Sequence, residues 1–188
     1  MQSFHLRSRP AVLLLAASLL TSLVLGVVVV VFHRVYDLGG EASRPAAEPF
    51  TDQQSRQQVL TPAREFVSAG KLKAATGGYL LKSCSTEEQP PYQGTMYVNF
   101  DLPTITETPG YFRTIARAMK ERGWREGLPP GRHPGGHTLA RDGLIAVYYR
   151  DPDLAGRGVL KISGECRNLT DHSTDSAGFV DVTGELTG

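Results

Sequence analysis

The chain has 188 residues, enough for one ordinary domain with accessory segments. Its 20 Lys and Arg residues nearly balance its 19 Asp and Glu residues, giving a net charge of +1 with histidine neutral. Three of the basic residues, Arg7, Arg9 and Arg34, precede every acidic residue, so the remainder carries 17 basic against 19 acidic groups. Such a balance offers no electrostatic footprint for nucleic acid, and it excludes a nucleic-acid partner.

The first element is an apolar run at residues 11–32, which is 22 residues long and carries no charge. As a helix it would span about 33 Å, enough for a hydrocarbon core of ~30 Å. The main alternative is a cleaved signal peptide, whose apolar core of about 7–15 residues is shorter. A lipoprotein is not predicted, because the first cysteine, Cys84, lies far beyond the run. We therefore predict an uncleaved signal-anchor helix that spans the lipid bilayer.

The basic residues that flank this run predict its orientation. Arg7 and Arg9 precede it without any acidic residue, whereas Arg34 follows it and is soon joined by Asp37. An excess of Lys and Arg marks the cytoplasmic side of a membrane helix. We expect residues 1–10 in the cytoplasm, 11–32 in the membrane, 33–55 as a flexible spacer and 56–188 as an extracytoplasmic domain.

A first helix of this domain is predicted between residues 53 and 75, where apolar and small residues recur on one helical face. Pro62 suits the first turn of a helix with Thr61 as its N-cap. An earlier start would place Pro62 inside the helix, where it should cause a kink. The Gly77-Gly78 pair is expected to end this element.

Two strands and a second helix follow. Residues 79–84 form a short apolar run, and residues 96–102 alternate between apolar and polar side chains, as a half-buried strand does. The second helix is predicted to start with Thr108 as N-cap and Pro109 in its first turn, and to end at Gly123. Its basic residues are expected on a solvated face.

The remaining elements are strands. Residues 137–141 and 144–150 flank Asp142-Gly143, a strong signal for a two-residue hairpin turn. Residues 159–166 predict a third strand, and residues 178–182 are a candidate edge strand. The order helix, two strands, helix, three strands predicts an α+β fold, with two helices on an antiparallel sheet.

Both cysteines, Cys84 and Cys166, follow the membrane run, where an even count favours a disulfide in an oxidising compartment. The alternative is two separate buried thiols. Closing a loop of about 80 residues would stabilise the domain by ~4 kcal/mol. The bond would join the ends of the first and last strands, which requires that both run the same way and that the Cα atoms lie within about 7 Å.

The motifs of nucleotide-binding loops, nucleophile elbows and zinc peptidases do not occur in the sequence. The group of most interest is His133 and His137, which could hold Zn²⁺ or Cu²⁺ if Asp142 or His172 completed the ligand set. Pro and Gly residues between them argue against a helix there. An exposed, flexible loop without a metal is the favoured interpretation, and the metal site is the alternative.

Two other polar groups contain residue types found in hydrolases. They are Asp171 and His172 with Ser173 or Ser176, and Asp151 and Asp153 with Glu165. The favoured interpretations are chance co-occurrence in a polar segment for the first group and capping of a turn by aspartate for the second. Asn168-Leu169-Thr170 is a glycosylation sequon, which matters only if the source glycosylates such sites.

Three tyrosines form the predicted interaction surface: Tyr97, Tyr148 and Tyr149. Because Tyr148 and Tyr149 are adjacent on a strand, one must point away from the other. If Tyr97 and one of that pair share the outer face of the sheet, they could line a surface for a partner or a ligand. The alternative is packing between strands.

Several short segments between residues 60 and 186 resemble small membrane-anchored proteins of mycobacteria and related actinobacteria. They are Gly77-Gly78-Tyr79, Ser83-Cys84, Pro90-Pro91-Tyr92-Gln93, Gly123-Trp124-Arg125, Asp142-Gly143 and Gly164-Glu165-Cys166-Arg167. The resemblance implies a bacterial cell envelope and a domain with paired cysteines. It supplies no catalytic residues.

The sequence therefore predicts a membrane-tethered module without a cofactor or a reaction of its own, which binds another envelope protein. The alternative is an extracytoplasmic domain that binds a small ligand or a metal near His133 and His137. An envelope enzyme is the third hypothesis.

Overall fold

The computed structural model of the protein describes residues 48–175 and 178–187. The predicted cytoplasmic segment (1–10), the membrane run (11–32) and most of the spacer (33–55) lie outside these residues. In chain order the described part contains α2 (Asp52–Ala69), β1 (Lys73–Ser83), β2 (Tyr92–Asp101), α3 (Thr108–Lys120), β3 (Arg125–Glu126), β4 (His137–Arg141), β5 (Leu144–Arg150), β6 (Arg157–Ser163), β7 (Val180–Asp181) and a 3-10 helix (Thr183–Glu185).

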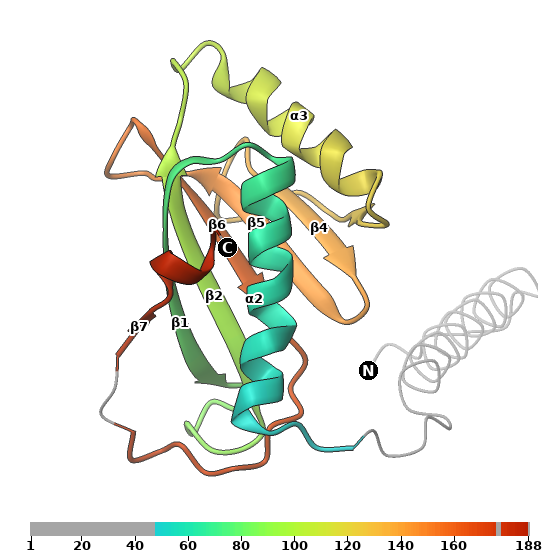
Figure 1. The fold of residues 1–188 in the computed structure, drawn as a ribbon, viewed down its shortest axis with the longest axis vertical. Helices are drawn as coiled ribbons and strands as arrows, with labels where there is room; N and C mark the ends of the chain where they lie inside the picture. The colour runs from blue at the N-terminus through green and yellow to red at the C-terminus, as the bar shows by residue number, and fades with distance from the viewer. Residues whose placement is uncertain (1–47, 176–177, 188) are drawn as a thin grey trace, which may run out of the picture. The chain divides into compact units, whose positions relative to one another are not determined.

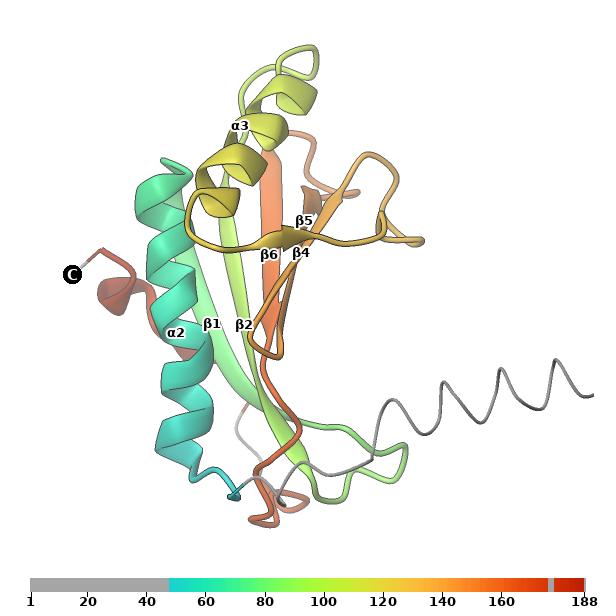
Figure 2. The same cartoon turned by 90° about the vertical axis from the view of Figure 1, so that its right-hand side faces the viewer.

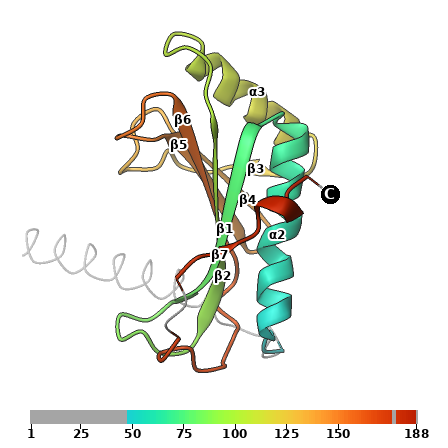
Figure 3. The same cartoon turned by 60° about the vertical axis from the view of Figure 1, so that its left-hand side comes forward.

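Seven strands form one sheet in the order β3-β4-β5-β6-β2-β1-β7 (Figure 1). Every pair of neighbouring strands is antiparallel. Figures 2 and 3 show α2 and α3 on the same side of this sheet. We call this side the inner face and the opposite side the outer face. The predicted α+β arrangement, two helices on an antiparallel sheet, is confirmed for the described residues.

The helix α2 begins at a cap that lies well before the predicted one. The hydroxyl of Thr51 accepts from the Gln54 N–H at 3.2 Å, and the Gln54 side chain accepts from the Thr51 N–H at 2.8 Å. This reciprocal capping box fixes the first turn. The prediction of Thr61 as N-cap is wrong, and Pro62 lies inside α2. The helix α2 therefore begins before residue 56, the predicted start of the domain.

The strand β1 runs through Gly77 and Gly78, which were predicted to end the preceding element. A Cβ atom at Gly77 would lie 2.8 Å from the Leu186 side chain, and one at Gly78 would lie 3.0 Å from Phe179. The two glycines therefore make room for C-terminal side chains on both faces of β1. The local sequence predicts that the two glycines end an element, whereas in the structure they are explained by tertiary packing within a strand.

The predicted hairpin between β4 and β5 is confirmed. Asp142 and Gly143 have φ values of 47° and 78°, and a type I′ turn requires positive φ at both positions. The second helix begins one residue earlier than predicted, because Glu107 and not Thr108 is its N-cap. The Thr108 hydroxyl donates instead to the Thr104 carbonyl at 3.0 Å.

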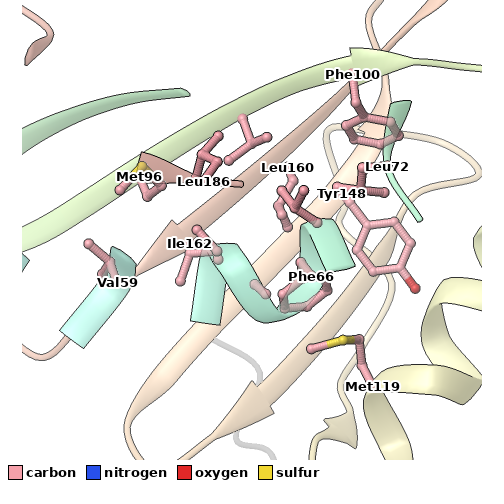
Figure 4. Close-up of a cluster of buried hydrophobic side chains, with 14 of the residues drawn as sticks. Val59, Phe66, Leu72, Met96, Phe100, Met119, Tyr148, Leu160, Ile162 and Leu186 are labelled. Carbon is pink, nitrogen blue, oxygen red and sulfur yellow. The ribbon is translucent and has the colours of Figure 1, made fainter. Parts of the chain in front are cut away.

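The core lies between the inner face and the two helices. Phe66 of α2 packs edge-on against Trp124, with ring centroids 5.1 Å apart, and lies 6.2 Å from the Tyr148 ring. Figure 4 shows Phe66 and Tyr148 in one cluster with Phe100 and Ile162 from the central strands. Burying each such side chain contributes about 1.5–3 kcal/mol, and this burial holds the helices on the sheet.

An ion pair lies at the boundary of this core, beside the end of α3. Both terminal guanidinium nitrogens of Arg141 donate to the Glu65 carboxylate, at 3.1 and 2.7 Å. The same guanidinium lies 4.7 Å from the Trp124 ring centroid. The Arg141 and Glu65 side chains are 23% and 22% exposed, so the pair is partly shielded from water. Bidentate geometry makes it a firm link between α2 and β4.

The predicted disulfide between Cys84 and Cys166 is present, with Cα atoms 6.1 Å apart. Both β1 and β6 pair antiparallel with β2, so they run the same way and end at the same end of the sheet. Beyond the bond, the Asn168 N–H donates to the Tyr92 carbonyl at 3.1 Å. The bond therefore fastens the segment after β6 to the end of β1.

Candidate functional site

Among the described residues, both helices lie on the inner side of the sheet, so neither covers the outer face (Figure 3). Along β2, Met96, Val98 and Phe100 are fully buried on the inner face. Tyr97 is half-buried and Asn99 is exposed, and both point to the outer face. The alternation of a strand thus builds the core with one set of residues and a surface with the other.

Tyr97 lies in a row that crosses three strands. It is paired with Lys161 of β6, which is paired in turn with Val147 of β5. The Lys161 ammonium lies 5.8 Å from the centroid of the Tyr97 ring, within the range of a cation–π contact. Tyr149 lies in the neighbouring row, and Ile145 on the same face is 50% exposed. These rows form a mainly apolar surface with one cation near its centre.

A hollow of about 460 Å³ lies beside this row, over β1, β2 and β7. One wall is Phe179, whose ring stands at 88° to the Tyr97 ring with centroids 5.3 Å apart. Phe179 is 61% exposed, an unfavourable state for a large apolar side chain in water. Asn99 and Asp181 add hydrogen-bonding groups to the rim. The hollow is suited to an apolar group flanked by polar ones.

The phenol of Tyr149 stays neutral at physiological pH. Burial raises its pKa, and the nearby Tyr97 and Asp151 raise it further. A neutral phenol both donates and accepts hydrogen bonds. The outer face can therefore bind a partner through apolar contact, aromatic contact and hydrogen bonds.

The two histidines predicted as metal ligands lie on opposite faces of the sheet. His133 stacks on Tyr149 of the outer face, with ring centroids 3.5 Å apart and ring planes at 9°. His137 stacks on Tyr148 of the inner face, with centroids 5.3 Å apart and planes at 4°. Since neighbouring residues of a strand point to opposite faces, the two imidazoles are not brought together around a cation. Within the described ranges, no group of three or more His, Cys, Asp or Glu residues could hold a metal ion.

Tyr148 belongs to the core, so its prediction as a surface residue is wrong. Its side chain is 1% exposed, and its hydroxyl donates to the Phe112 carbonyl at 3.2 Å. Burial raises the pKa of this phenol, and the negative charge of Glu126 adds to the effect. Tyr97 and Tyr149 do share the outer face, and their part in binding stays a prediction.

His172 serves to connect segments of the fold. Its Nδ1 lies 2.8 Å from the Asp175 carboxylate, and its Nε2 lies 3.1 Å from the Asp52 carboxylate at the start of α2. Both ring nitrogens therefore have carboxylate partners. Ser176, one of the two serines considered for triad chemistry, lies outside the described residues.

The predicted carboxylate pair is not assembled either. Asp151 accepts two backbone N–H groups of its own turn, at 2.8 and 3.1 Å, as the turn interpretation expected. Glu165 lies elsewhere and accepts from the Gln58 and Arg167 side chains, each at 3.2 Å. In the sequon, Asn168 is fully buried and donates to Asp52 at 2.8 Å, so its amide is not accessible in the folded domain.

Phe179 is the functional candidate that sequence reasoning missed. It lies in the polar tail, and the sequence assigned residues 178–182 only to a candidate edge strand, which the structure confirms as β7. The available signal was a large aromatic residue among Gly, Ser and Asp. Its partner Gly78 could not be recognised, because the contact joins residues about a hundred positions apart.

In the part of the chain that the structure describes, no helix is long and apolar enough to cross a membrane. The predicted membrane run at residues 11–32 lies outside that part. The described residues belong to one compact unit, Glu48–Gly188.

Residues 51–185 match the family described as "Putative lipoprotein LppJ". This chain belongs to the LppJ family. Proteins of that name from Mycobacterium tuberculosis strains H37Rv and CDC 1551 and from Mycobacterium bovis are 36% identical to it over 159 residues. The alignment covers 83% of this chain and 82% of each relative. No solved structure matches the chain.

The match to a family described as a putative lipoprotein supports a membrane-associated place at the bacterial cell envelope, as the sequence resemblance implied. It does not support the predicted single-pass helix, and it differs from the prediction that the chain is not a lipoprotein. A bacterial lipoprotein is held at the membrane by lipid bonded to a cysteine sulfur. In this member of the family, the two cysteines of the sequence are bonded to each other. Neither Cys84 nor Cys166 therefore has a free sulfur for such an attachment.

Proposed function

We propose that the chain is a membrane-tethered module of the cell envelope, and that it binds another envelope protein through the outer face of its sheet. The observation that carries this proposal is the aromatic surface on the outer face, where Phe179 is exposed and Tyr97 and Tyr149 are partly exposed. Protein interfaces are enriched in aromatic residues and poor in charge at their centre. A few such side chains usually supply most of the binding free energy.

The contacts among the side chains of the outer face support a role in binding a partner rather than in catalysis. His133 and Tyr149 are stacked on each other, and Lys161 is directed at Tyr97. These contacts fix the orientation of the aromatic rings before a partner arrives. A surface ordered in advance loses less conformational entropy on binding.

The tether that we propose is a single helix at residues 11–32, with residues 1–10 in the cytoplasm. Its support is the run of 22 uncharged residues and the absence of a free cysteine sulfur in the sequence. Cells fed an alkyne fatty acid would test this. We expect no label on this chain and resistance to alkaline extraction, with a resident lipoprotein as the labelled control. Label on the chain would overturn the helical tether and leave the interaction surface untouched.

Site-specific photocrosslinking on full-length protein in its native membrane tests the interaction. A photoreactive amino acid replaces either Ile145 on the outer face or Arg113, which is exposed on α3. We expect one dominant adduct from position 145 and none from position 113. Tyr97→Ala should lower the yield from position 145 at least tenfold without lowering the unfolding temperature. Equal adducts from both positions would contradict binding through the outer face.

A further inference from the structure

The edge of β1 is covered along only part of its length. β1 runs from Lys73 to Ser83, and all of its later half is paired with β2. On the other side, β7 pairs with Gly78 and Tyr79 alone. Among the described residues, no strand pairs with this edge between Leu80 and Ser83. Figure 3 shows the short β7 beside the longer β1.

The alternation of backbone groups shows what this edge offers. The Gly77 N–H donates to the Thr183 hydroxyl at 3.0 Å, and the Gly77 carbonyl accepts from the Val182 N–H at 2.9 Å, so both face β7. In an antiparallel ladder every second residue faces the same side. Leu81 and Ser83 therefore present their N–H and carbonyl groups at the open edge. Unpaired groups of this kind are a template for another strand.

Two hollows of about 230 and 500 Å³ follow this edge. Both are lined by Leu80 and Leu81 of β1 on one side and by His172 and Asp175 on the other. A neighbouring strand lies ~4.8 Å away in a sheet, and its side chains alternate between the two faces. The hollows therefore leave room for a strand between β1 and the segment that contains His172 and Asp175.

The opposite edge of the sheet lacks this feature. There, β3 pairs with Leu139 and Ala140 of β4, and the Gly127 N–H donates to the Thr138 carbonyl at 2.9 Å. Consequently β4 is covered over most of its five residues. In the part of the chain that is described, only β1 of these two strands has a stretch of several residues without a strand beside it.

Charge indicates what kind of strand would fit. Two exposed carboxylates line the larger hollow beside the open edge: Glu88 in the β1–β2 loop and Asp175 in the segment that faces it. The cations on this side are Lys82 and, when protonated, His172, which already lies between two carboxylates. Leu80, Leu81 and Tyr97 supply the apolar contacts. The surroundings complement apolar and cationic side chains.

We propose that the edge of β1 between Leu80 and Ser83 receives an extended segment of a protein partner as an added strand, with apolar and basic residues alternating along it. Strand addition uses main-chain hydrogen bonds for affinity and side-chain pockets for specificity. This inference rests on the proposed function, because it names how a protein partner would engage the same side of the sheet. The hollow beside Tyr97 would then accept the residues that follow the strand.

The test places a photoreactive amino acid at position 82 of the full-length chain in its native membrane, beside the positions 145 and 113 used above. Two variants isolate the backbone group. Leu81→Pro removes the outward N–H and is tolerated on an edge strand, whereas Leu81→Ala removes the same side chain and keeps the N–H. We expect the adduct from position 82 to map to one contiguous segment of a single partner. Leu81→Pro should reduce its yield about tenfold relative to Leu81→Ala.

The outcomes separate this inference from the proposed function. An adduct from position 145 without one from position 82 would overturn the added strand and leave binding through the outer face intact. Absence of an adduct from both positions would overturn both. Equal yields from Leu81→Pro and Leu81→Ala would also overturn the added strand.

Hydrogen exchange gives a second measurement that does not depend on how the proline variant folds. In the free chain, the amides of Leu81 and Ser83 should exchange faster than those of Leu80 and Lys82, which face β2. Slow exchange at Leu81 and Ser83 in the free chain would mean that the edge is already covered, and the proposal would fail.

Discussion

The inner and outer faces of the sheet are built by the same strands, yet they differ in what covers them. On β2, Val98 and Phe100 are fully buried beneath the helices, while Tyr97 and Asn99 between them reach the outer surface. The inner residues lose contact with water on folding, and the outer ones largely do not. Stability should therefore depend on one face and binding on the other.

The largest effect that this comparison predicts is at Phe100. Phe100→Ala should lower the free energy of unfolding by about 3–5 kcal/mol, because it removes a fully buried ring from the core and leaves a cavity. Urea denaturation of the purified protein measures this loss. The neighbouring Asn99→Ala serves as the control and should change the free energy by less than about 0.5 kcal/mol. Similar losses from both variants would break the distinction between the faces.

The disulfide should contribute the second largest effect. Replacing both partners, Cys84→Ser with Cys166→Ser, should cost about 2–4 kcal/mol, because the bond closes a loop with a sequence separation of 82 residues. Thermal unfolding monitored by circular dichroism measures the change. Wild-type protein under reducing conditions should unfold at the same temperature as the double variant. A large difference in unfolding temperature between those two samples would mean that the serines change stability by something other than loss of the disulfide.

The Glu65–Arg141 pair should contribute less, because water still reaches part of it. Glu65→Gln keeps the size of the side chain but leaves the guanidinium without its counter-charge. We expect a loss of about 1–3 kcal/mol, between the values of exposed and buried pairs. Glu126→Gln, which removes the carboxylate from the exposed Lys120 pair at 2.9 Å, should leave the free energy of unfolding unchanged within error in the same assay, because water screens an exposed pair.

The parts of the fold that the sequence predicted are those with strong local signals. The turn at Asp142-Gly143 could be predicted because few residues tolerate positive φ. The central strand around Val98 could be predicted because apolar and polar side chains alternate along it. The start of α2 was misplaced although Thr51 and Gln54 have capping-box spacing, because Pro62 offered a competing signal.

The candidate site could be predicted only in part. Alternation shows that Tyr148 and Tyr149 face opposite sides, but it cannot tell which side the helices cover. The role of Gly78 depends on Phe179, and no local pattern joins two residues so far apart. The open edge of β1 depends on where β7 stops, which is again a tertiary property.

The smallest predicted effect concerns His172 beside the open edge of β1. Burial alone would lower its pKa, but hydrogen bonds to Asp175 and Asp52 together with the charges of both carboxylates outweigh it, so the pKa is raised above its ordinary value. The Tyr92 ring, 5.2 Å away and nearly perpendicular, packs against the imidazole from β2. The protonated ring thus links the C-terminal segment to the start of α2.

A raised pKa in the folded state fixes the sign of the pH dependence. The link contributes fully below the unfolded pKa of about 6.5, and it is lost as pH rises through the folded pKa. Since both carboxylates are exposed, we expect a contribution of about 0.2–1 kcal/mol. The difference in unfolding free energy between wild type and His172→Gln should be larger at pH 6 than at pH 9. A difference that is constant or grows with pH would show that the imidazole is not held as a cation between Asp52 and Asp175.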